Sequence, residues 1–496
     1  MCEPKSNFEN ITTLHGTQQF TWMKGRSLRI WTVIMVTNVL ATVGYLYVIS
    51  GTYKNDQIIT RINANCKVNQ VPFPAVSICN FNLVSLKQTK TITKILINNN
   101  RTQAEIEEFY RSIPELTNFG KSISKLRNFT QIMAILKRHY FTVETIMEEV
   151  HQTCEDLLIH CTFNRSPKSC SEMFNLIKTY DGHCCTFNYA ALDEGNLDDI
   201  TDDEDVEYYV DPSGIDLKTS GMVVTSESGR GSGLSVVFNV EPSNYPNWSM
   251  TPYHGAKILI TDPTDYPEIT VLYKYVIIGE SLDIKVEPKI FQSDDDIRRM
   301  PVEKRACIFH DESALVHSYR YSTETCETEC KMKNYADHCG CIPYKYPSDK
   351  TSRICDFEDL PCLNNLRADR TGVRKTCNPV CYIECRDKKY SITSDVMPLL
   401  ADFYPPNVTK DRNLSELSSL QVYFAKSTCN CYDRMLLIDF NYFVATYGGV
   451  FSLSFGASII TSLELMYLLL SMLFKVIWRS LIKSNKVDTN FEMSTP

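Results

Sequence analysis

The chain has 496 residues, 43% of them hydrophobic, and a formal net charge of −8 at pH 7. This negative balance, without any basic stripe, argues against a nucleic-acid partner. No H-E-x-x-H, G-x-S-x-G or C-x-x-C motif occurs, so we expect neither an enzyme nor a metal or other cofactor.

Two apolar segments are predicted to cross a membrane. Residues 30–51 carry no charge and match the roughly 20 residues that a bilayer core requires. Residues 440–474 carry one charge, Glu464. A signal peptide is disfavoured for the first segment, because the apolar run begins only at Ile30 and exceeds the usual length of such a region.

The flanking charges predict the orientation of both segments. Basic residues precede the first and follow the second: Lys24, Arg26, Arg29, Lys475, Arg479, Lys483 and Lys486. Because cytoplasmic flanks are enriched in Lys and Arg, residues 1–29 and 475–496 are expected in the cytoplasm. The protein is then a multi-pass plasma-membrane protein in contact with lipid, and residues 52–439 lie outside.

Cysteines and glycosylation motifs agree with this topology. Of 20 cysteines only Cys2 falls on the cytoplasmic side, and such density outside is typical of an oxidising compartment. Five sequons predict glycosylation in the same region: Asn100, Asn128, Asn247, Asn407 and Asn413.

The outer region reads as a mixed α+β body. Helical periodicity dominates 102–150. Strand-like runs occupy 234–240, 256–260, 269–278 and 420–424. Residues 193–211 hold ten carboxylates among nineteen positions. This stretch is either a solvated loop or an electrostatic attraction for cations or a cationic ligand, and it does not match a calcium-binding loop.

The second apolar segment is too long for one straight crossing. Thirty-five helical residues would span about 52 Å, against a hydrocarbon core of about 30 Å. The segment must therefore project, tilt or break, and Gly448, Gly449 and Gly456 offer places to break. On a continuous helix Ala445, Gly449, Ser452 and Gly456 would form one stripe of small residues, which serves either helix packing or a pore lining.

Glu464 favours the pore. A carboxylate within a span is costly and normally faces a cavity or a partner, and the segment contains no Lys or Arg. The alternative is a protonated or snorkelling glutamate near the inner interface. Because two spans cannot enclose a water path, a pore requires a closed oligomer, in which rings of hydroxyl, backbone and carboxylate oxygens favour cations.

Several motifs in chain order resemble the degenerin/epithelial sodium channel/acid-sensing ion channel superfamily. "GAS" at 456–458, followed by "LEL" at 463–465, looks like its selectivity motif. "LHG" at 14–16, "FPAVSICN" at 73–80 and "CCTFN" at 184–188 are similar to its other signatures. A ladder of cysteines looks like the family's thumb: 326, 330, 339, 341, 355, 362, 377, 381 and 385.

The resemblance implies a homo- or heterotrimer, each chain having two transmembrane helices that flank a disulfide-rich, hand-like extracellular domain. This domain has palm β-strands, a helical finger and a thumb at about 307–385. The resemblance also implies a sodium-selective channel blocked by amiloride-type drugs. The short length, the extra cysteines and the acidic stretch look more like invertebrate members of the superfamily.

The resemblance further assigns roles to pore residues. Gly456, Ala457 and Ser458 would form the selectivity filter. His15 and Gly16 would re-enter the membrane and line the lower pore. The gate would involve Ala445, Gly449 and Ser452, with Glu464 below, and a bulky side chain in place of Ala445 is expected to hold the channel open.

Disulfide pairings are implied in the same way: Cys79–Cys184, Cys161–Cys170, Cys307–Cys385, Cys326–Cys381, Cys330–Cys377, Cys339–Cys362 and Cys341–Cys355. We further expect Cys66 to bridge Cys429 or Cys431, with Cys429 taken first, and Cys154 to pair with Cys185. One outer thiol then remains.

The stimulus is left open by the sequence. No histidine occurs between 51 and 73, and Lys304 stands where proton-gated relatives carry Trp, which argues against acid gating of that kind. An RF-amide-like cationic peptide would suit the acidic outer region. Proton-gated, mechanically gated and constitutively open channels remain alternatives, as does a two-anchor disulfide-rich receptor or adhesion protein.

Overall fold

The computed structural model describes residues 16, 19–55, 58–119, 126–190, 222–225, 227–249, 251–318, 320–347, 352–368, 377, 379–400, 404–409 and 413–489. The chain separates into two compact units. The helix unit comprises Met1–Ile59, Asp296–Met300 and Met435–Pro496, and the body comprises Thr60–Asp295 and Pro301–Arg434.

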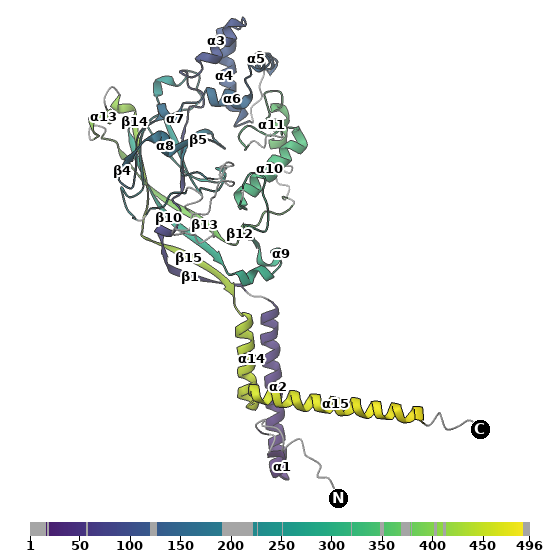
Figure 1. Ribbon diagram of the computed structural model, residues 1–496. Helices are drawn as coiled ribbons and strands as arrows, with labels where there is room; N and C mark the ends of the chain where they lie inside the picture. Colours follow the sequence, from purple (N-terminus) through teal and green to yellow (C-terminus); the bar gives the residue numbers. More distant parts are fainter. Residues whose placement is uncertain are drawn as a thin grey trace, which may run out of the picture. The chain divides into compact units, whose positions relative to one another are not determined.

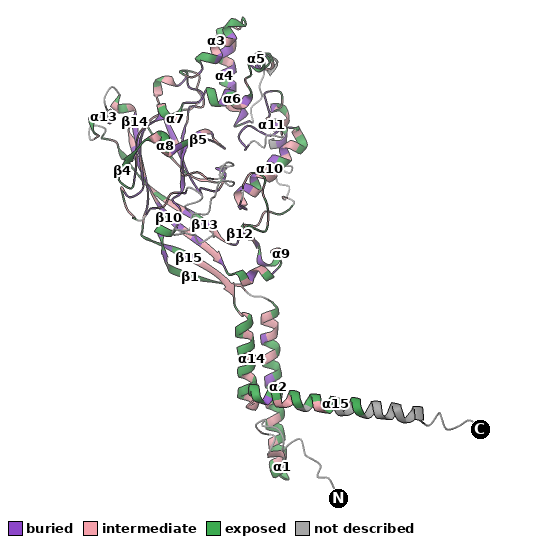
Figure 2. Cartoon of the chain, in the orientation of Figure 1, coloured by how far each residue is buried: buried purple, intermediate pink, exposed green. Residues whose placement is uncertain are grey.

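The helix unit contains the two apolar segments. Its helices are α1 (Gln19–Trp22), α2 (Arg26–Lys54), α14 (Phe440–Phe455) and α15 (Ile459–Thr489). Helices α2 and α14 lie side by side (Figure 1). Only 11% of the most apolar window of α2 is buried, so this helix is not the core of a soluble fold, and Figure 2 shows how much of α2 and α14 stays exposed.

The second apolar segment breaks at Gly456. This residue ends α14 in the left-handed conformation, with φ of 61°, and its N–H donates to the carbonyl of Ser452 at 2.8 Å. Helices α14 and α15 meet at 80°. Of the three outcomes allowed by its length, the segment therefore breaks. Gly448 and Gly449 remain helical, and α15 continues to Thr489, beyond the predicted end of the span at residue 474.

One sequence expectation needs correction here. The stripe of small residues does not run through four helical positions, because Gly456 lies outside α14 in a left-handed conformation. Ala445, Gly449 and Ser452 keep their common face on α14, at spacings of four and three residues. The fourth member of the predicted stripe belongs to the break instead.

Two main β-sheets form the frame of the body. The larger has the order β1 (Ile58–Lys67), β15 (Thr428–Leu436), β10 (Glu280–Ser293), β14 (Leu417–Phe424), β7 (Leu234–Asn239), β3 (Leu158–Phe163), β4 (Ser166–Lys168), with β13 (Asp387–Pro398) also paired to β10. The smaller has the order β5 (Phe174–Thr179), β6 (Gly182–Phe187), β2 (Ala75–Asn80), β8 (Gly255–Thr261), β9 (Leu272–Ile277). A short pair joins β11 (Cys307–Ile308) to β12 (Ile383–Glu384).

Phe73 links the two sheets. It is fully buried, and its ring packs edge-on against Phe163 and Phe424 of the larger sheet and Phe187 of the smaller one, with centroids 5.4, 5.5 and 6.0 Å away. Strand β2 follows at once and is buried along its whole length. The predicted "FPAVSICN" signature is thus the centre of the core, since buried aromatic rings contribute large apolar areas.

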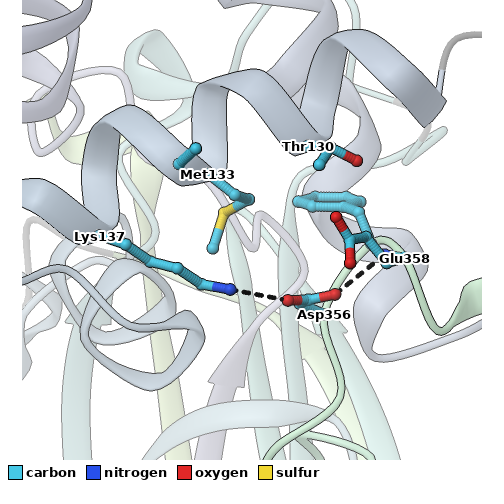
Figure 3. Close-up of a pocket in the computed structure, with 7 residues that line it drawn as sticks. Thr130, Met133, Lys137, Asp356 and Glu358 are labelled. Atoms are coloured by element: carbon cyan, nitrogen blue, oxygen red, sulfur yellow. Dashed lines mark hydrogen bonds and ion pairs between the residues drawn. The ribbon is translucent and has the colours of Figure 1, made fainter.

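Helices make a second core. Its members are α3 (Lys90–Asn98), α4 (Gln103–Ser112), α5 (Leu126–Arg138), α6 (Val143–Glu149), α10 (Thr323–Cys339) and α11 (Leu360–Ala368). Phe357 lies 5.6 Å from Phe109 and 5.3 Å from Phe129, centroid to centroid. At the surface of this contact Lys137 of α5 and Asp356 form an ion pair of 3.0 Å (Figure 3). The short helices α7 (Cys154–Leu157), α8 (Cys170–Met173), α9 (Val302–Arg305) and α13 (Pro406–Thr409) complete the body.

In the described part of the chain, nine disulfides tie the body together. Seven of them are Cys79–Cys184, Cys161–Cys170, Cys307–Cys385, Cys326–Cys381, Cys330–Cys377, Cys339–Cys362 and Cys341–Cys355, the pairs given above from the resemblance. The other two are Cys66–Cys429, one of the two partners left open for Cys66, and Cys154–Cys185. Cys326 and Cys330 share one face of α10, as their spacing of four predicts. Among the described cysteines, Cys431 carries a free, buried thiol.

Candidate functional site

Helix α14 turns two different faces to its surroundings. The face toward α2 carries Phe443, Tyr447 and Ser454, each of which contacts a residue of α2. Three small residues of α14 are exposed in the single chain: Ala445, Gly449 and Ser452. Each lies two positions along the chain from one of the residues that contact α2, which places it about 200° away around the helix. The small-residue face is therefore not the face that packs within the chain.

The glycines of α14 support this distinction. A Cβ atom built on Gly448 or Gly449 would meet nothing within 4 Å. Packing inside the chain consequently does not require glycine at either position. The close approach of a helix from another chain would require glycine there, because glycine permits the shortest distance between two backbones.

Polar contacts fix the lower end of α14 to α2. The Asn38 side-chain amide donates to the Ser454 carbonyl at 2.8 Å, and the Thr42 and Ser454 hydroxyls lie 2.9 Å apart. The Ser454 carbonyl is in the last turn of α14, where carbonyls lack partners within the helix. Asn38 thus satisfies a carbonyl one residue before the helix ends.

Three further contacts hold the other end of the pair. The Ser50 and Tyr447 hydroxyls are hydrogen-bonded, and Tyr447 also donates to the Leu46 carbonyl at 3.3 Å. Tyr53 stacks on Phe443 with ring centroids 4.4 Å apart. The α2–α14 pair is therefore held by polar contacts near both ends.

The break itself is stabilised by Ser458. Its hydroxyl accepts from the Thr461 backbone N–H at 3.2 Å, which is the geometry of a helix N-cap, and lies 3.2 Å from the Thr461 hydroxyl. Gly456 and Ala457 complete the three-residue break, and Glu464 is half-buried in the second turn of α15. The predicted filter residues thus form one irregular segment between two helices.

The predicted lower-pore motif lies partly in the described structure. His15 lies outside the described residues. The Gly16 carbonyl accepts a hydrogen bond from the Trp31 indole at 3.0 Å. Gly16 has a φ of 87°, and a Cβ there would come within 2.9 Å of the Met35 sulfur. Both the backbone conformation and the space favour glycine at this position.

The body contains a buried group of carboxylates that sequence reasoning missed. Asp265, Glu324 and Glu384 offer oxygens within 4.8 Å of one another, a set that could hold a cation. Burial raises the pKa of all three carboxyls, and that of Asp265 lies well above its usual range. Neighbouring carboxylates raise each of the three pKa values further. Burial and Glu384 raise the pKa of nearby Asp387 to about 6.

Basic groups balance this cluster in part. Lys389 lies 3.5 Å from Asp387 and 4.0 Å from Glu324. Burial acts to raise the pKa of Asp262, but Lys388, 3.4 Å away, and Arg320 outweigh it, so that the pKa is lowered. The cluster therefore mixes carboxyls that titrate at unusually high pH with one that stays ionised.

The remaining predicted sites are on the surface or outside the description. Asn100, Asn247 and Asn413 are exposed. The side chains of Asn128 and Asn407, and the acidic stretch 193–211, lie outside the described residues. Asn38 and Thr42 were also missed by sequence reasoning, although polar residues spaced by four in an apolar segment are a signal for a helix contact.

Comparison with known proteins identifies the chain's relatives. "Sodium channel protein Nach" of Drosophila melanogaster is 25% identical over 452 residues, covering 88% of this chain and 81% of that protein. "Pickpocket protein 28" of the same organism is 25% identical, covering 86% and 72%. "Epithelial sodium channel subunit gamma" of Xenopus laevis is 20% identical, covering 69% and 51%.

The family assignment rests on a match along nearly the whole chain. The solved "Cryo-EM structure of a proton-activated chloride channel" aligns over 88% of this chain and 97% of that chain, with 7% sequence identity and a TM-score of 0.29. The family described as "Amiloride-sensitive sodium channel" matches residues 8–468. The protein is therefore a membrane protein of an ion channel family, not an enzyme, and the chain belongs to the amiloride-sensitive sodium channel family.

Proposed function

We propose that this protein is a subunit of a sodium-selective, amiloride-sensitive cation channel of the plasma membrane that opens on an extracellular stimulus. The observation that carries the proposal is the break at Gly456–Ser458, next to a helix face of small residues that α2 does not cover. Irregular backbone at membrane depth is tolerated where it faces protein or lines water. A water-lined break in a channel family is the natural place for a filter.

In this proposal α2 and the α14–α15 pair cross the membrane, with residues 1–29 and 475–496 in the cytoplasm and 52–439 outside. Two spans cannot surround a pore, so three copies, or sister subunits, assemble about one axis. The face with Ala445, Gly449 and Ser452 then lines the gate, since it is the face left uncovered within one chain.

Ions meet two kinds of oxygen in this pore. Sodium sheds part of its hydration at Gly456, Ala457 and Ser458, where backbone and hydroxyl oxygens replace water. A ring of Glu464 carboxylates attracts cations below the filter. His15 and Gly16 line the lower pore.

We propose a cationic peptide of the RF-amide type as the agonist. The supporting feature is the acidity of the chain, with a net charge of −8 and ten carboxylates in 193–211. Electrostatic attraction raises the local concentration of a cationic ligand.

Voltage-clamp recording from oocytes expressing this chain tests the proposal. Applied peptides should evoke a sodium current that amiloride blocks, whereas acid pulses should not. A chain present at the cell surface that gives no amiloride-sensitive current with peptides, acid, proteases or membrane stretch would contradict the channel assignment for a homomer, and co-expression with sister subunits would then extend the test to heteromers.

A Glu464→Gln exchange tests the ring of carboxylates separately. It removes the charge while keeping the side-chain shape, so sodium conductance should fall and the preference for cations weaken. Unchanged conductance and selectivity would remove Glu464 from the pore without touching the channel assignment.

A further inference from the structure

Cys431 lies beside a disulfide. Its thiol is free, and the sulfur atoms of Cys66, Cys429 and Cys431 all lie within 4.8 Å of one another. Cys66 belongs to β1, and the other two belong to β15. All three are buried in the core between the sheets.

Strand geometry explains why the three sulfurs meet. Side chains alternate along a strand, so Cys429 and Cys431 point to the same face of β15, whereas Asn430 between them is exposed. Cys66 faces that side of β15 from the neighbouring strand, and its Cα lies 5.1 Å from that of Cys429. A thiol and a disulfide are thereby held together by the sheet.

We propose that Cys431 exchanges with the Cys66–Cys429 disulfide, so that Cys66 pairs with either Cys429 or Cys431. The Cys431 thiolate attacks the Cys66 sulfur, the Cys66–Cys429 bond breaks, and the Cys429 thiolate leaves and takes up the proton that Cys431 lost. One disulfide and one thiol are present before and after, so the step needs no oxidant or reductant.

Attack of the Cys431 thiolate on the Cys429 sulfur would not give a stable alternative disulfide. It would join Cys429 to Cys431, two positions apart in one strand, whose Cα atoms are separated by about 6.6 Å. That separation is close to the upper limit of the range of about 4.4–6.8 Å between the Cα atoms of disulfide-bonded cysteines. The side chains of Cys429 and Cys431 also point in the same direction and do not face each other. The exchange therefore alternates between two ties from β1 to β15.

The surroundings make this exchange slow but possible. Burial, and then the charge of Asp433, raise the pKa of the Cys431 thiol, so little thiolate forms at neutral pH. Lys67 on β1 and Lys289 on β10 neighbour the site, but they alternate with Cys66 and Ile290 and so lie on the other face of the sheet. Below that pKa, the rate of exchange should consequently rise about tenfold for each unit by which the pH is raised.

The exchange concerns the two strands, β1 and β15, that are joined along the chain to the apolar helices. In the chain β1 follows α2, and β15 precedes α14. Moving the tie from Cys429 to Cys431 shifts its attachment along β15 by about 6.6 Å. The link between β1 and β15, which continue along the chain into α2 and α14, thus has two covalent states.

Peptide mapping of the full chain tests the exchange. In a Cys2→Ser background, the purified protein is held at pH 7 or pH 8.5, denatured in acid, and alkylated with maleimide. Trypsin then releases the peptides 62–67 and 427–434, joined by the disulfide, and fragmentation shows whether Cys429 or Cys431 carries the label. We expect label on Cys431 at first and on both after incubation at pH 8.5. Label that stays on Cys431 alone overturns the proposal.

Two single variants give an independent measure. In the same background Cys429→Ala should contain no free thiol, because Cys431 then pairs with Cys66, and Cys431→Ala should also contain none. Two free thiols in the Cys429→Ala protein at the cell surface would overturn the alternative pairing. Cys341→Ala is the matched control: Cys355 has no third cysteine nearby, so this protein should contain two free thiols, those of Cys355 and Cys431.

Discussion

At the scale of single residues, Ser458 connects helix geometry with ion selection. Its hydroxyl caps α15, and losing an N-cap costs about 1 kcal/mol. Losing the cap loosens the end of α15 next to the proposed filter and removes one oxygen from it, so we expect Ser458→Ala to lower the sodium-to-potassium permeability ratio. Reversal potentials in mixed sodium and potassium solutions measure this ratio. Ser471→Ala, a serine-to-alanine change further along α15, should leave it unchanged, and an equal shift in both variants would refute the role.

Asp387 gives a prediction for the body. Its pKa of about 6 in the folded protein lies above the ordinary 3.8, so the folded state binds the proton more tightly than the unfolded state. Stability should therefore rise as the pH falls from 7.5 to 5.5, by about 1 kcal/mol from this group. Asp387→Asn should stabilise the protein at pH 7.5 and remove that part of the pH dependence.

Unfolding of the purified protein at the two pH values measures this effect. Asp395→Asn is the matched control, because Asp395 is an exposed carboxylate on the same strand, β13. If Asp387→Asn and Asp395→Asn give the same pH dependence as the unaltered protein, Asp387 does not take up a proton in this range.

At the scale of elements, the α2–α14 pair depends on Asn38. Its amide reaches the Ser454 carbonyl in the last turn of α14, and hydrogen bonds between membrane helices contribute about 1 kcal/mol. Asn38→Ala should lower the midpoint of thermal unfolding in detergent and weaken sodium selectivity, because the break begins two residues after Ser454. Thr37→Ala is the control, since the Thr37 hydroxyl bonds only to its own helix, at the Ile34 carbonyl. Equal effects of the two variants would argue against the contact.

The sequence was a good guide to some elements and not to others. The runs 234–240 and 256–260 match β7 and β8 closely, because β-branched and apolar residues bounded by turns mark buried strands. The periodic region 102–150 contains α4, α5 and α6, and the capping threonines Thr102 and Thr142 mark where α4 and α6 begin. Strand β10 was missed, because Pro288 and its charged residues hide the alternation.

At the scale of the whole molecule, what escaped prediction depends on distant parts of the chain meeting. The parallel pairing of β10 with β14 joins residues more than a hundred positions apart, as in Leu282 opposite Leu420. The carboxylate cluster likewise combines a loop after β8, the first turn of α10 and strand β12. Local sequence patterns do not predict contacts between residues that lie so far apart in the chain. The length of the segment predicted a break as one of three outcomes, with Gly448, Gly449 and Gly456 as candidate places, but only the structure assigns it to Gly456.

Assembly is the property of the whole molecule that the exposed face of α14 predicts. If three copies place Ser452 around one axis, Ser452→Cys creates a ring of thiols, and thiolates bind soft metal ions strongly. Cadmium at micromolar concentration should then block the current, and a reducing wash with a chelator should restore it. Leu453→Cys is the matched control, because the neighbouring residue is 91% exposed but points about 100° away around the helix. Block of both variants to the same extent, or of neither, would mean that the face carrying Ala445, Gly449 and Ser452 does not surround the ion path.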